Sequence, residues 1–458
     1  MEDMKNGKRS SFSGKLGYVL AAAGASVGLG NIWRFPYLAA KYGGGIFLII
    51  YIVLALTFGY TMIVAETAIG RMTRKSPVGA FKSFGKKKWL SFGGWINAVI
   101  PVLIVPYYSV IGGWVIKYLV EYFRGNAKLL AEDGYFTDFI SNGVSTELCF
   151  VAFCAFTLII IFAGVQNGIE RVSKIMMPIL IVLSVIIAVY SVTRPGALAG
   201  VKYFLVPNVK NFSWMTVVSA MGQMFYSLSI AMGILITFGS YMKKDTAIED
   251  STRNVEIFDT GIAIMAGLMI IPAVFAFSGG DPDTLQAGPS LMFITIPKVF
   301  QNMGFGTVIG IVFFLLVLFA AVTSSIALTE SAVSTFEDEL GWGRKKATVL
   351  VGVIMLALGS LSSLGYGPLA GIKIIGMQFL DLFDFLTNSV MMPIAALLTS
   401  LLVSRVVGID KIEEEIIHGE SAFRRKKVFV VMIKYLCPVF AIIILLSSVA
   451  NALGWIKM

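Results

Sequence analysis

The chain has 458 residues, of which 57% are hydrophobic and 14% charged, and its net charge is +10. A typical soluble domain carries roughly 25% charged residues, so this chain has too few polar side chains to coat water-facing domains. The composition excludes a cytosolic enzyme, a disordered chain and a disulfide-rich secreted module. It predicts a polytopic membrane protein.

Cysteine and histidine usage excludes the common metal centres. His418 is the single histidine, so a histidine-built metal or haem site is not expected. The three cysteines, Cys149, Cys154 and Cys437, lie in apolar runs without zinc-ligand spacing. Residues 1–14 are polar and basic, so we expect no cleavable signal peptide.

Long intervals between charged residues mark the candidate membrane spans, because a membrane helix needs ~20 apolar residues. In lipid every backbone polar group needs an internal partner, so we expect these intervals to be helices. Eleven such intervals follow Lys15, Lys41, Lys88, Glu147, Lys174, Lys210, Asp259, Lys298, Lys346, Asp384 and Lys427. We therefore predict an all-α polytopic membrane protein with eleven transmembrane helices.

Basic residues indicate the orientation of these spans, because cytoplasmic loops carry an excess of Lys and Arg. The basic runs 71–88, 243–244, 344–346 and 424–427 fall on one side of the predicted membrane. We expect this side to be cytoplasmic, which places the N-terminus inside and the C-terminus outside a plasma (inner) membrane. The net charge is then mostly a topology signal, and no nucleic-acid partner is expected.

Spans one and six have interiors that weaken a helix. Residues 24–31 read GASVGLGN, and residues 227–233 read SLSIAMG, with Gly222 and Gln223 one turn earlier. One interpretation is close helix packing, which small residues permit. The other is a pair of discontinuous helices, which is typical of a five-plus-five inverted repeat with a binding site at the breaks.

The second interpretation predicts the domain organisation. It gives a cytoplasmic tail at 1–13, a first five-helix repeat at 14–193, an extracellular loop at 194–213, a second, inverted repeat at 214–405, a cytoplasmic loop at 406–428 and one extra helix at 429–458. A mid-membrane break frees carbonyl oxygens for a small cation. It also frees amide groups for an anion such as a carboxylate. A zwitterionic amino acid together with Na⁺ matches both requirements.

Several motifs resemble the neurotransmitter:sodium symporter family, in particular its bacterial amino-acid branch with the LeuT-type fold. The run GASVGLGNIWRFP (24–36), followed by three glycines at 43–45, is similar to the first span of that family. Its third, sixth and eighth spans are matched by the pair Tyr107–Tyr108, by GQMFYSLSIAMG (222–233), and by VTSSIAL (322–328) with FEDEL (336–340). The resemblance covers roughly residues 5–455 and implies transport without enzyme activity.

The resemblance implies two sodium sites built from oxygen ligands, which a hard cation prefers. The first would use the Ser26 carbonyl, Asn31, Ser227 and a residue of span seven, and the substrate carboxylate would complete it. The second would use the Gly24, Val27 and Ala320 carbonyls with the hydroxyls of Thr323 and Ser324. Taken alone, such hydroxyls often bond back to carbonyls of their own helix.

The resemblance also implies a substrate site. The carboxylate would meet the amides of Leu29 and Gly30 and the Tyr108 hydroxyl, and the ammonium would meet carbonyls near Ser26 and Tyr226, with Ser227 close. The side-chain pocket would consist of Ile104, Tyr108, Tyr226, Ser229, Met232, Ser324 and Leu328. Helix packing is the alternative role of its apolar members. Because the set contains no acidic residue and is mostly apolar, we expect a neutral hydrophobic or aromatic amino acid.

Span seven departs from the family pattern. The family usually has an asparagine in the first sodium site, whereas our alignment, with one gap before Pro272, puts Asp259 there. A solvated charge at a helix start is the alternative. If Asp259 supplies both a Na⁺ ligand and a fixed negative charge, no chloride requirement is expected.

Charged residues suggest two gates and glycine suggests a hinge. Arg34 and Asp384 match the extracellular gate pair of the family. Arg9 and Asp338 match its inner gate pair, which Tyr241 would help to close. For Asp338 an ordinary charge at a helix end is the alternative. Glu66 is expected at the membrane interface, where a role in gating is the alternative. Gly168 and Pro178 in span five mark either a simple kink or an inner end that unwinds.

These features predict a symporter that imports its substrate by alternating access with two Na⁺ ions. A proton-coupled transporter and a non-transporting amino-acid sensor of the same fold are the alternatives. Nucleophile–base dyads, phosphate-binding glycine loops and metal clusters are missing from the sequence, so no enzyme activity is expected. Besides the substrate, membrane lipid is the expected partner, and the mechanism requires no oligomer.

Overall fold

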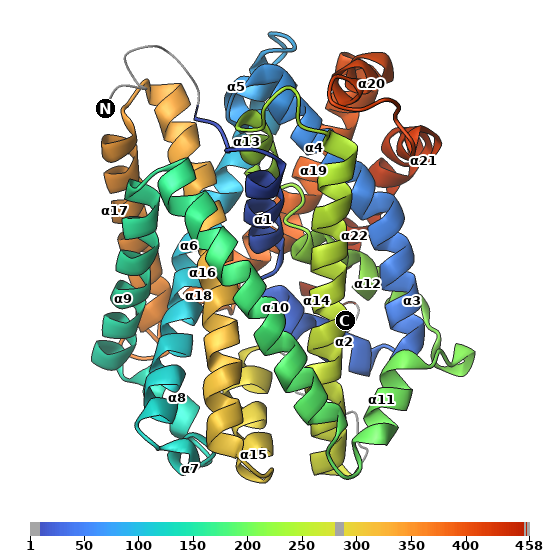
Figure 1. The fold of residues 1–458 in the computed structure, drawn as a ribbon. Coiled ribbons are helices and arrows are strands. Elements are labelled where there is room, and N and C mark those ends of the chain that lie inside the picture. The colour runs from blue at the N-terminus through green and yellow to red at the C-terminus, as the bar shows by residue number, and fades with distance from the viewer. Residues whose placement is uncertain (1–9, 280–287, 453–454, 456–458) are drawn as a thin grey trace.

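The computed structural model describes residues 10–279, 288–452 and 455 of the chain. Within these ranges the fold is helical, and β-structure is limited to the isolated bridges Gly44–Pro207 and Ile374–Met377. Figure 1 shows an elongated bundle whose long helices run roughly parallel to one axis. This confirms the predicted all-α class.

Nine continuous helical stretches in the described ranges are long and apolar enough to cross a membrane. They are Gly45–Thr73 (α3, Gly45–Leu54, and α4, Tyr60–Thr73), α6 (Lys88–Phe123), α9 (Gly143–Phe162), Val165–Val192 (ending in α10, Arg171–Val192), α14 (Ile248–Ser278), α16 (Gly306–Leu340), α17 (Arg344–Leu364), Phe379–Val407 (α18, Phe379–Asp384, and α19, Met392–Leu401) and Lys426–Asn451 (α21, Lys426–Val431, and α22, Cys437–Ala452). Joined helices in this set are connected by π-helical segments such as Ala55–Gly59.

The first predicted span is a bent pair of helices. The second part, Gly30–Lys41 with α2 (Phe35–Lys41), is bent by 52° from the direction of the first part, α1 (Lys15–Ser26). Small residues at the bend let neighbouring helices approach. A Cβ atom added to Gly28 would lie 2.7 Å from Ser324 Oγ, and one added to Gly30 would lie 2.4 Å from the Tyr226 ring. Close packing and a helix break therefore occur at the same residues.

The segment predicted as span six consists of two short helices. α12 (Trp214–Ser227) and α13 (Ile234–Ser240) are separated by residues 228–233. Ser229 and Ala231 have positive φ angles of 53° and 59°, and Gly233 has 70°. Positive φ is unfavourable for residues with a Cβ atom, so tertiary contacts must hold this segment in place.

Shorter helices complete the fold. They are α5 (Pro77–Lys82), α7 (Ala127–Leu130), α8 (Tyr135–Ser141), α11 (Ala197–Leu205), α15 (Ile296–Gln301, after a π-helical turn Leu291–Thr295) and α20 (Ile409–Ile417). Figure 1 places α5 and α20 at one end of the bundle and α7 and α15 at the other. The predicted loops 194–213 and 406–428 therefore contain helices, α11 and α20, and the last span begins at Lys426.

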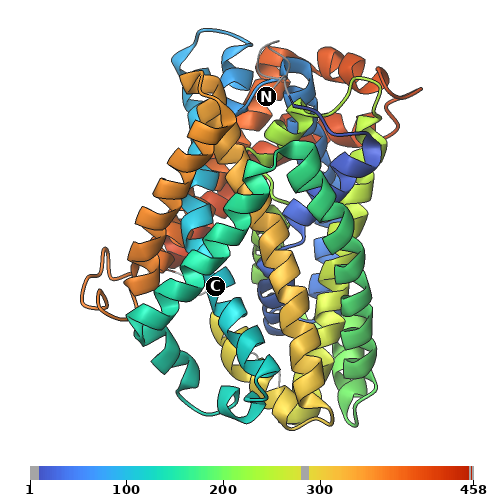
Figure 2. The same ribbon diagram turned by 60° about the vertical axis from the view of Figure 1, so that its left-hand side comes forward.

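The broken helices lie inside the bundle. α1 packs against α10, α14 and α16, and α13 packs against α4 and α16. Figures 1 and 2 show the longer helices surrounding this interior pair. Because outer helices supply the apolar surface, the interior can hold polar and irregular backbone, which lipid contact would not permit.

Candidate functional site

A cavity lies between the breaks of the two interior helices. Its free volume is about 30 Å³. The lining comes from the first break, α6, the second break and α16, and consists of Ala25, Ser26, Gly28, Leu29, Gly30, Asn31, Ile104, Tyr108, Tyr226, Ser229, Met232, Ser324 and Leu328. None of these side chains is charged. The cavity therefore suits a ligand whose own charges meet backbone groups.

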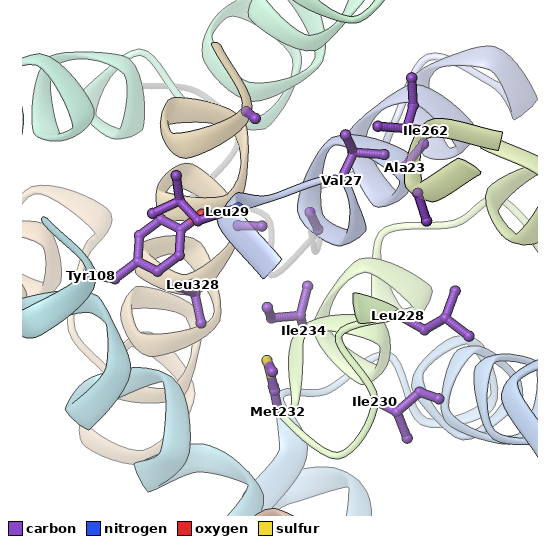
Figure 3. Packing of buried hydrophobic residues seen from close by; sticks show 14 of the residues in the cluster. Ala23, Val27, Leu29, Tyr108, Leu228, Ile230, Met232, Ile234, Ile262 and Leu328 are labelled. Atoms are coloured by element: carbon purple, nitrogen blue, oxygen red, sulfur yellow. Dashed lines mark hydrogen bonds between the residues drawn. The ribbon is translucent and has the colours of Figure 1, made fainter. Parts of the chain in front are cut away.

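The predicted substrate residues converge on this cavity with one exception. Every member of the set except Ser227 lines it. Figure 3 shows the Tyr108 ring beside Leu29 and Leu328, while Met232 comes from the second break. The Leu29 backbone nitrogen donates to the Tyr108 hydroxyl at 3.3 Å. The amide and the hydroxyl that were expected to meet a carboxylate are therefore adjacent.

Ser227 belongs instead to a buried polar cluster behind the cavity. Asn31 Nδ2 donates to Ser227 Oγ at 2.9 Å and to Asp259 Oδ1 at 2.8 Å, and Ser227 Oγ lies 2.9 and 3.0 Å from the two carboxylate oxygens. Asp259 is fully buried, eleven residues into α14, so the alternative of a solvated charge at a helix start is wrong.

Tyr51 completes the cluster and was missed by sequence analysis. Its hydroxyl donates to Asp259 Oδ2 and Ser227 Oγ, both at 3.1 Å. A buried tyrosine hydroxyl usually needs a hydrogen-bond partner. The tyrosine in the middle of the second span was therefore the feature of the sequence that could have indicated a buried polar cluster. Asp259 forms no ion pair within 4.0 Å among the residues that the structure describes. A buried carboxylate with only neutral donors is costly, and a bound cation would compensate it.

A second group of oxygens lies where α1 ends beside α16. Ser324 Oγ lies 3.2, 3.1 and 3.4 Å from the carbonyl oxygens of Gly24, Ala25 and Val27. The Thr323 hydroxyl donates to carbonyls of its own helix, Phe319 at 2.9 Å and Ala320 at 3.2 Å. Five of the expected ligand positions are therefore gathered, and Thr323 shows the back-bonding that we named as the alternative.

The expected outer gate residues contact different tyrosines and form no direct ion pair with each other. The Arg34 guanidinium carbon lies 5.3 Å from the centroid of the Tyr226 ring, at the edge of the cavity. The Asp384 carboxylate accepts from the Tyr107 hydroxyl at 3.2 Å. No ion pair within 4.0 Å joins Arg34 and Asp384, both of which are described residues.

The expected inner gate is seen only in part. Arg9 lies outside the described residues. Asp338 accepts from the Ser76 backbone nitrogen at 2.7 Å. The Tyr241 hydroxyl donates to Glu330 at 2.7 Å, and Arg344 Nη1 lies 3.0 Å from the same carboxylate oxygen.

Glu66 lies inside the bundle. Its side chain is fully buried, and α4 continues beyond it to Thr73. Its carboxylate accepts from the Ala231 backbone nitrogen at 2.8 Å. Glu66 therefore satisfies an amide of the irregular segment 228–233.

The expected hinge residues lie in one continuous helical stretch, Val165–Val192. Gly168 is in its π-helical first turns, where an added Cβ atom would lie 2.1 Å from the Ile160 carbonyl oxygen. Pro178 lies within α10. Close beside them Glu170 accepts from the Ser13 backbone nitrogen at 2.9 Å and pairs with Lys174 at 2.6 Å.

The described part of the chain holds no group of three or more His, Cys, Asp or Glu side chains arranged to bind a metal ion. All three cysteines are free thiols. The candidate cation sites are therefore built from carbonyl, hydroxyl and amide oxygens and the carboxylate of Asp259, which suits an alkali ion.

Comparisons with known proteins agree on one family. The family model described as the Sodium:neurotransmitter symporter family matches residues 9–137 and 134–455. An uncharacterized sodium-dependent transporter of Bacillus subtilis (strain 168) is 34% identical over 450 residues, which covers 97% of this chain and 99% of that protein. The sodium- and chloride-dependent GABA transporter 2 of Homo sapiens is 26% identical over 474 residues, covering 89% and 75%.

One solved structure also matches closely. The crystal structure of MhsT in complex with L-phenylalanine has a TM-score of 0.86 and 34% sequence identity. The match covers 96% of this chain and 100% of that one.

Proposed function

Since the chain belongs to the sodium:neurotransmitter symporter family, and is therefore a sodium-coupled membrane transporter and not an enzyme, we propose that it imports a neutral hydrophobic or aromatic amino acid. The observation that carries the proposal is the uncharged cavity between two helix breaks. Free amides at such breaks favour a carboxylate. The bound L-phenylalanine of MhsT supports an aromatic substrate.

The substrate carboxylate would accept from the Tyr108 hydroxyl and the Leu29 amide, which are hydrogen-bonded to each other in the structure. The Gly30 amide would be its third donor. Carbonyl oxygens near Ser26 and Tyr226 would receive the ammonium group. The substrate side chain would lie against apolar lining residues such as Ile104, Met232 and Leu328. An amino acid with a charged side chain would be rejected, because no lining residue could neutralise it.

The first sodium site in this proposal is the cluster of Asn31, Ser227 and Asp259 with the Ser26 carbonyl, supported by Tyr51. A cation there would neutralise the buried Asp259 carboxylate, which neutral donors alone surround. The same carboxylate would supply the negative charge for which other members of the family use chloride. The transporter would therefore need no chloride, unlike the human relative, whose name states a chloride dependence.

The second sodium site would use the Gly24, Val27 and Ala320 carbonyls with Thr323 and Ser324. The Ser324 hydroxyl lies 3.2 and 3.4 Å from the Gly24 and Val27 carbonyl oxygens, which supports a gathered set of oxygen ligands. In this site the hydrogen atoms of both hydroxyl groups would point away from the cation, so that their oxygens face it. A substrate that completes the first site would raise its sodium affinity, and sodium would raise the affinity for the substrate by the same factor.

The proposed architecture has eleven spans. α1 with Gly30–Lys41 and α12 with α13 would each form one discontinuous span, in addition to the nine continuous stretches. The first repeat would end at 193 and the inverted repeat would cover 214–405, with the basic-rich end of the bundle in the cytoplasm. Arg34 and Asp384 would close the outer side, Arg9 and Asp338 with Tyr241 the inner side, and Gly168 and Pro178 would let the inner end of the fifth span unwind.

A thermal-shift screen of the twenty amino acids tests this function. We expect one or a few hydrophobic or aromatic amino acids to raise the unfolding temperature in Na⁺ and to lose the effect when K⁺ replaces Na⁺. A shift that persists in K⁺ would contradict sodium coupling and favour the proton-driven alternative. Counterflow exchange in liposomes then separates a transporter from a sensor, because a sensor binds the same ligand without exchange.

A further inference from the structure

Three consecutive exposed lysines lie where α6 begins. Lys86, Lys87 and Lys88 form no ion pair within 4.0 Å with any residue that the structure describes. Carboxylates pair with basic side chains of other basic-rich segments, among them Arg71, Lys244, Arg344 and Lys426. The run 86–88 is therefore a concentrated positive charge without a counter-charge among the described residues.

Two exposed aromatic side chains continue the same face of the helix. Phe92 and Trp95 follow Lys88 at the i+4 and i+7 positions, so the three share one face of α6. Phe92 is 55% and Trp95 40% exposed, whereas Gly93 and Gly94 pack against Phe81 of α5 and Val78. The lysines thus extend from an aromatic face that points away from the bundle.

The length of α6 allows this face to lie at the membrane boundary. The helix has 36 residues, which corresponds to about 54 Å, whereas the hydrocarbon core of a bilayer is about 30 Å thick. The helix is therefore long enough for its first turns to extend into the headgroup region. An exposed tryptophan near a helix end is typical of the aromatic belt of membrane proteins.

Lys82, at the end of α5, joins the same face. Its Nζ atom lies 5.7 Å from the centroid of the Trp95 ring, and it pairs with Glu339 at 2.7 Å. Its side chain remains 44% exposed. Lys82 therefore adds a fourth exposed lysine beside the aromatic side chains.

We propose that this lysine surface, formed by Lys82, Lys86, Lys87 and Lys88 with Phe92 and Trp95, binds the headgroup of an anionic phospholipid. The phosphate would contact the lysine ammonium groups, and the first part of an acyl chain would lie along Phe92 and Trp95. A topology signal alone requires basic residues on one side of the membrane. It requires neither exposed aromatic side chains on the same face nor the absence of counter-charges.

A lipid bound to the lysine surface would affect the proposed inner gate through α5. Contacts between this short helix and the end of α16 include those of Lys82 with Glu339 and of the Ser76 backbone nitrogen with Asp338, each at 2.7 Å. A phosphate that draws Lys82 away would remove the first of these contacts. Anionic lipid would then loosen α5 beside Asp338.

Native mass spectrometry of the purified full chain tests the proposal without a transport assay. The detergent-solubilised protein is mixed with phosphatidylglycerol or phosphatidylcholine of identical acyl chains, and the retained lipid is counted. We expect the wild type to retain phosphatidylglycerol in preference. The variant K86Q/K87Q/K88Q should lose this preference by about fivefold for each lysine removed, the factor expected for one basic side chain at an anionic surface.

The matched control is K345Q/K346Q/K427Q, which removes the same charge elsewhere and should retain the wild-type preference. These three lysines are also exposed and form no ion pair within 4.0 Å with a described residue. Equal unfolding temperatures of both variants exclude misfolding as the cause. Equal retention of the two lipids by the wild type, or equal loss in both variants, would overturn the proposal. Displacement of phosphatidylglycerol by millimolar inorganic phosphate would assign the surface to free phosphate and would also overturn it.

Discussion

The carboxylate of Glu66 in α4 accepts a hydrogen bond from the backbone nitrogen of Ala231 at 2.8 Å. Both residues are fully buried, and Ala231 has a φ angle of 59°. The contact joins a regular helix to the segment where the sixth span is interrupted. A buried N–H group without a partner is costly, so the acid stabilises a backbone conformation that the local sequence disfavours.

Glu66→Ala should therefore destabilise the protein more than Glu66→Gln. Alanine leaves the Ala231 amide unsatisfied, which costs about 1–3 kcal/mol, whereas glutamine retains an acceptor oxygen. Thermal unfolding of the two purified variants measures the difference. Equal unfolding temperatures would show that the contact does not hold segment 228–233 in place.

Asp259→Asn should make uptake respond to chloride. The substitution keeps an oxygen ligand but removes the negative charge beside the proposed first sodium ion, so a chloride ion becomes necessary to balance it. Substrate uptake by proteoliposomes is measured with chloride or gluconate as the anion. Asp250→Asn, a change in the same helix outside the cluster, should behave like the wild type. A wild type that already requires chloride would contradict the assignment.

Tyr108→Phe should weaken substrate binding and leave folding intact. Removal of a hydroxyl that binds a charged carboxylate costs about 1.5–3 kcal/mol, or roughly 10- to 100-fold in affinity. Tyr118→Phe is the control, because that buried hydroxyl donates to the Phe293 carbonyl at 2.7 Å, away from the cavity. Isothermal titration with the best ligand of the thermal-shift screen gives both affinities. Equal losses in the two variants would place the carboxylate elsewhere.

Ser324→Ala should lower the apparent sodium affinity by about tenfold, because the hydroxyl is a proposed ligand of the second ion and its loss is not replaced. The neighbouring Ser325→Ala removes a hydroxyl that lies 3.3 Å from Thr157 Oγ1 and should not change sodium dependence. The sodium concentration that gives half-maximal substrate binding is the readout. If Ser325→Ala has the larger effect, the site is not at Ser324.

Glu170→Gln should loosen the segment before α1. The Glu170 carboxylate contacts the backbone nitrogen and the hydroxyl of Ser13 and pairs with Lys174. Weakening these bonds should speed amide exchange at residues 11–13 by about fivefold, the equivalent of one net hydrogen bond. Hydrogen–deuterium exchange mass spectrometry measures it. Glu121→Gln, which disrupts the pair with Lys117, should leave this segment unchanged, and equal effects would contradict the prediction.

Much of the site follows from local chemistry. Glycine and serine at residues 24–31 and 227–233 weaken a helix wherever it lies, so the positions of both breaks could be predicted. Length and apolarity likewise predicted the long helices. The short helices α5 and α20 were not predicted, because α5 has only six residues and the nine residues of α20 are too polar to give a membrane signal.

The partners of polar side chains depend on contacts between distant segments. Tyr51 and Asp259 are 208 positions apart, and Glu66 and Ala231 are 165 apart. No periodicity in one helix reveals which neighbour its buried face will meet, so Tyr51 was missed and the contact of Glu66 with Ala231 was not predicted. Composition and helix-weakening residues act within a few positions and can be read along the chain. Which oxygens gather around one point is decided only when the helices pack, because a buried polar group is stable only beside the partner that packing brings to it.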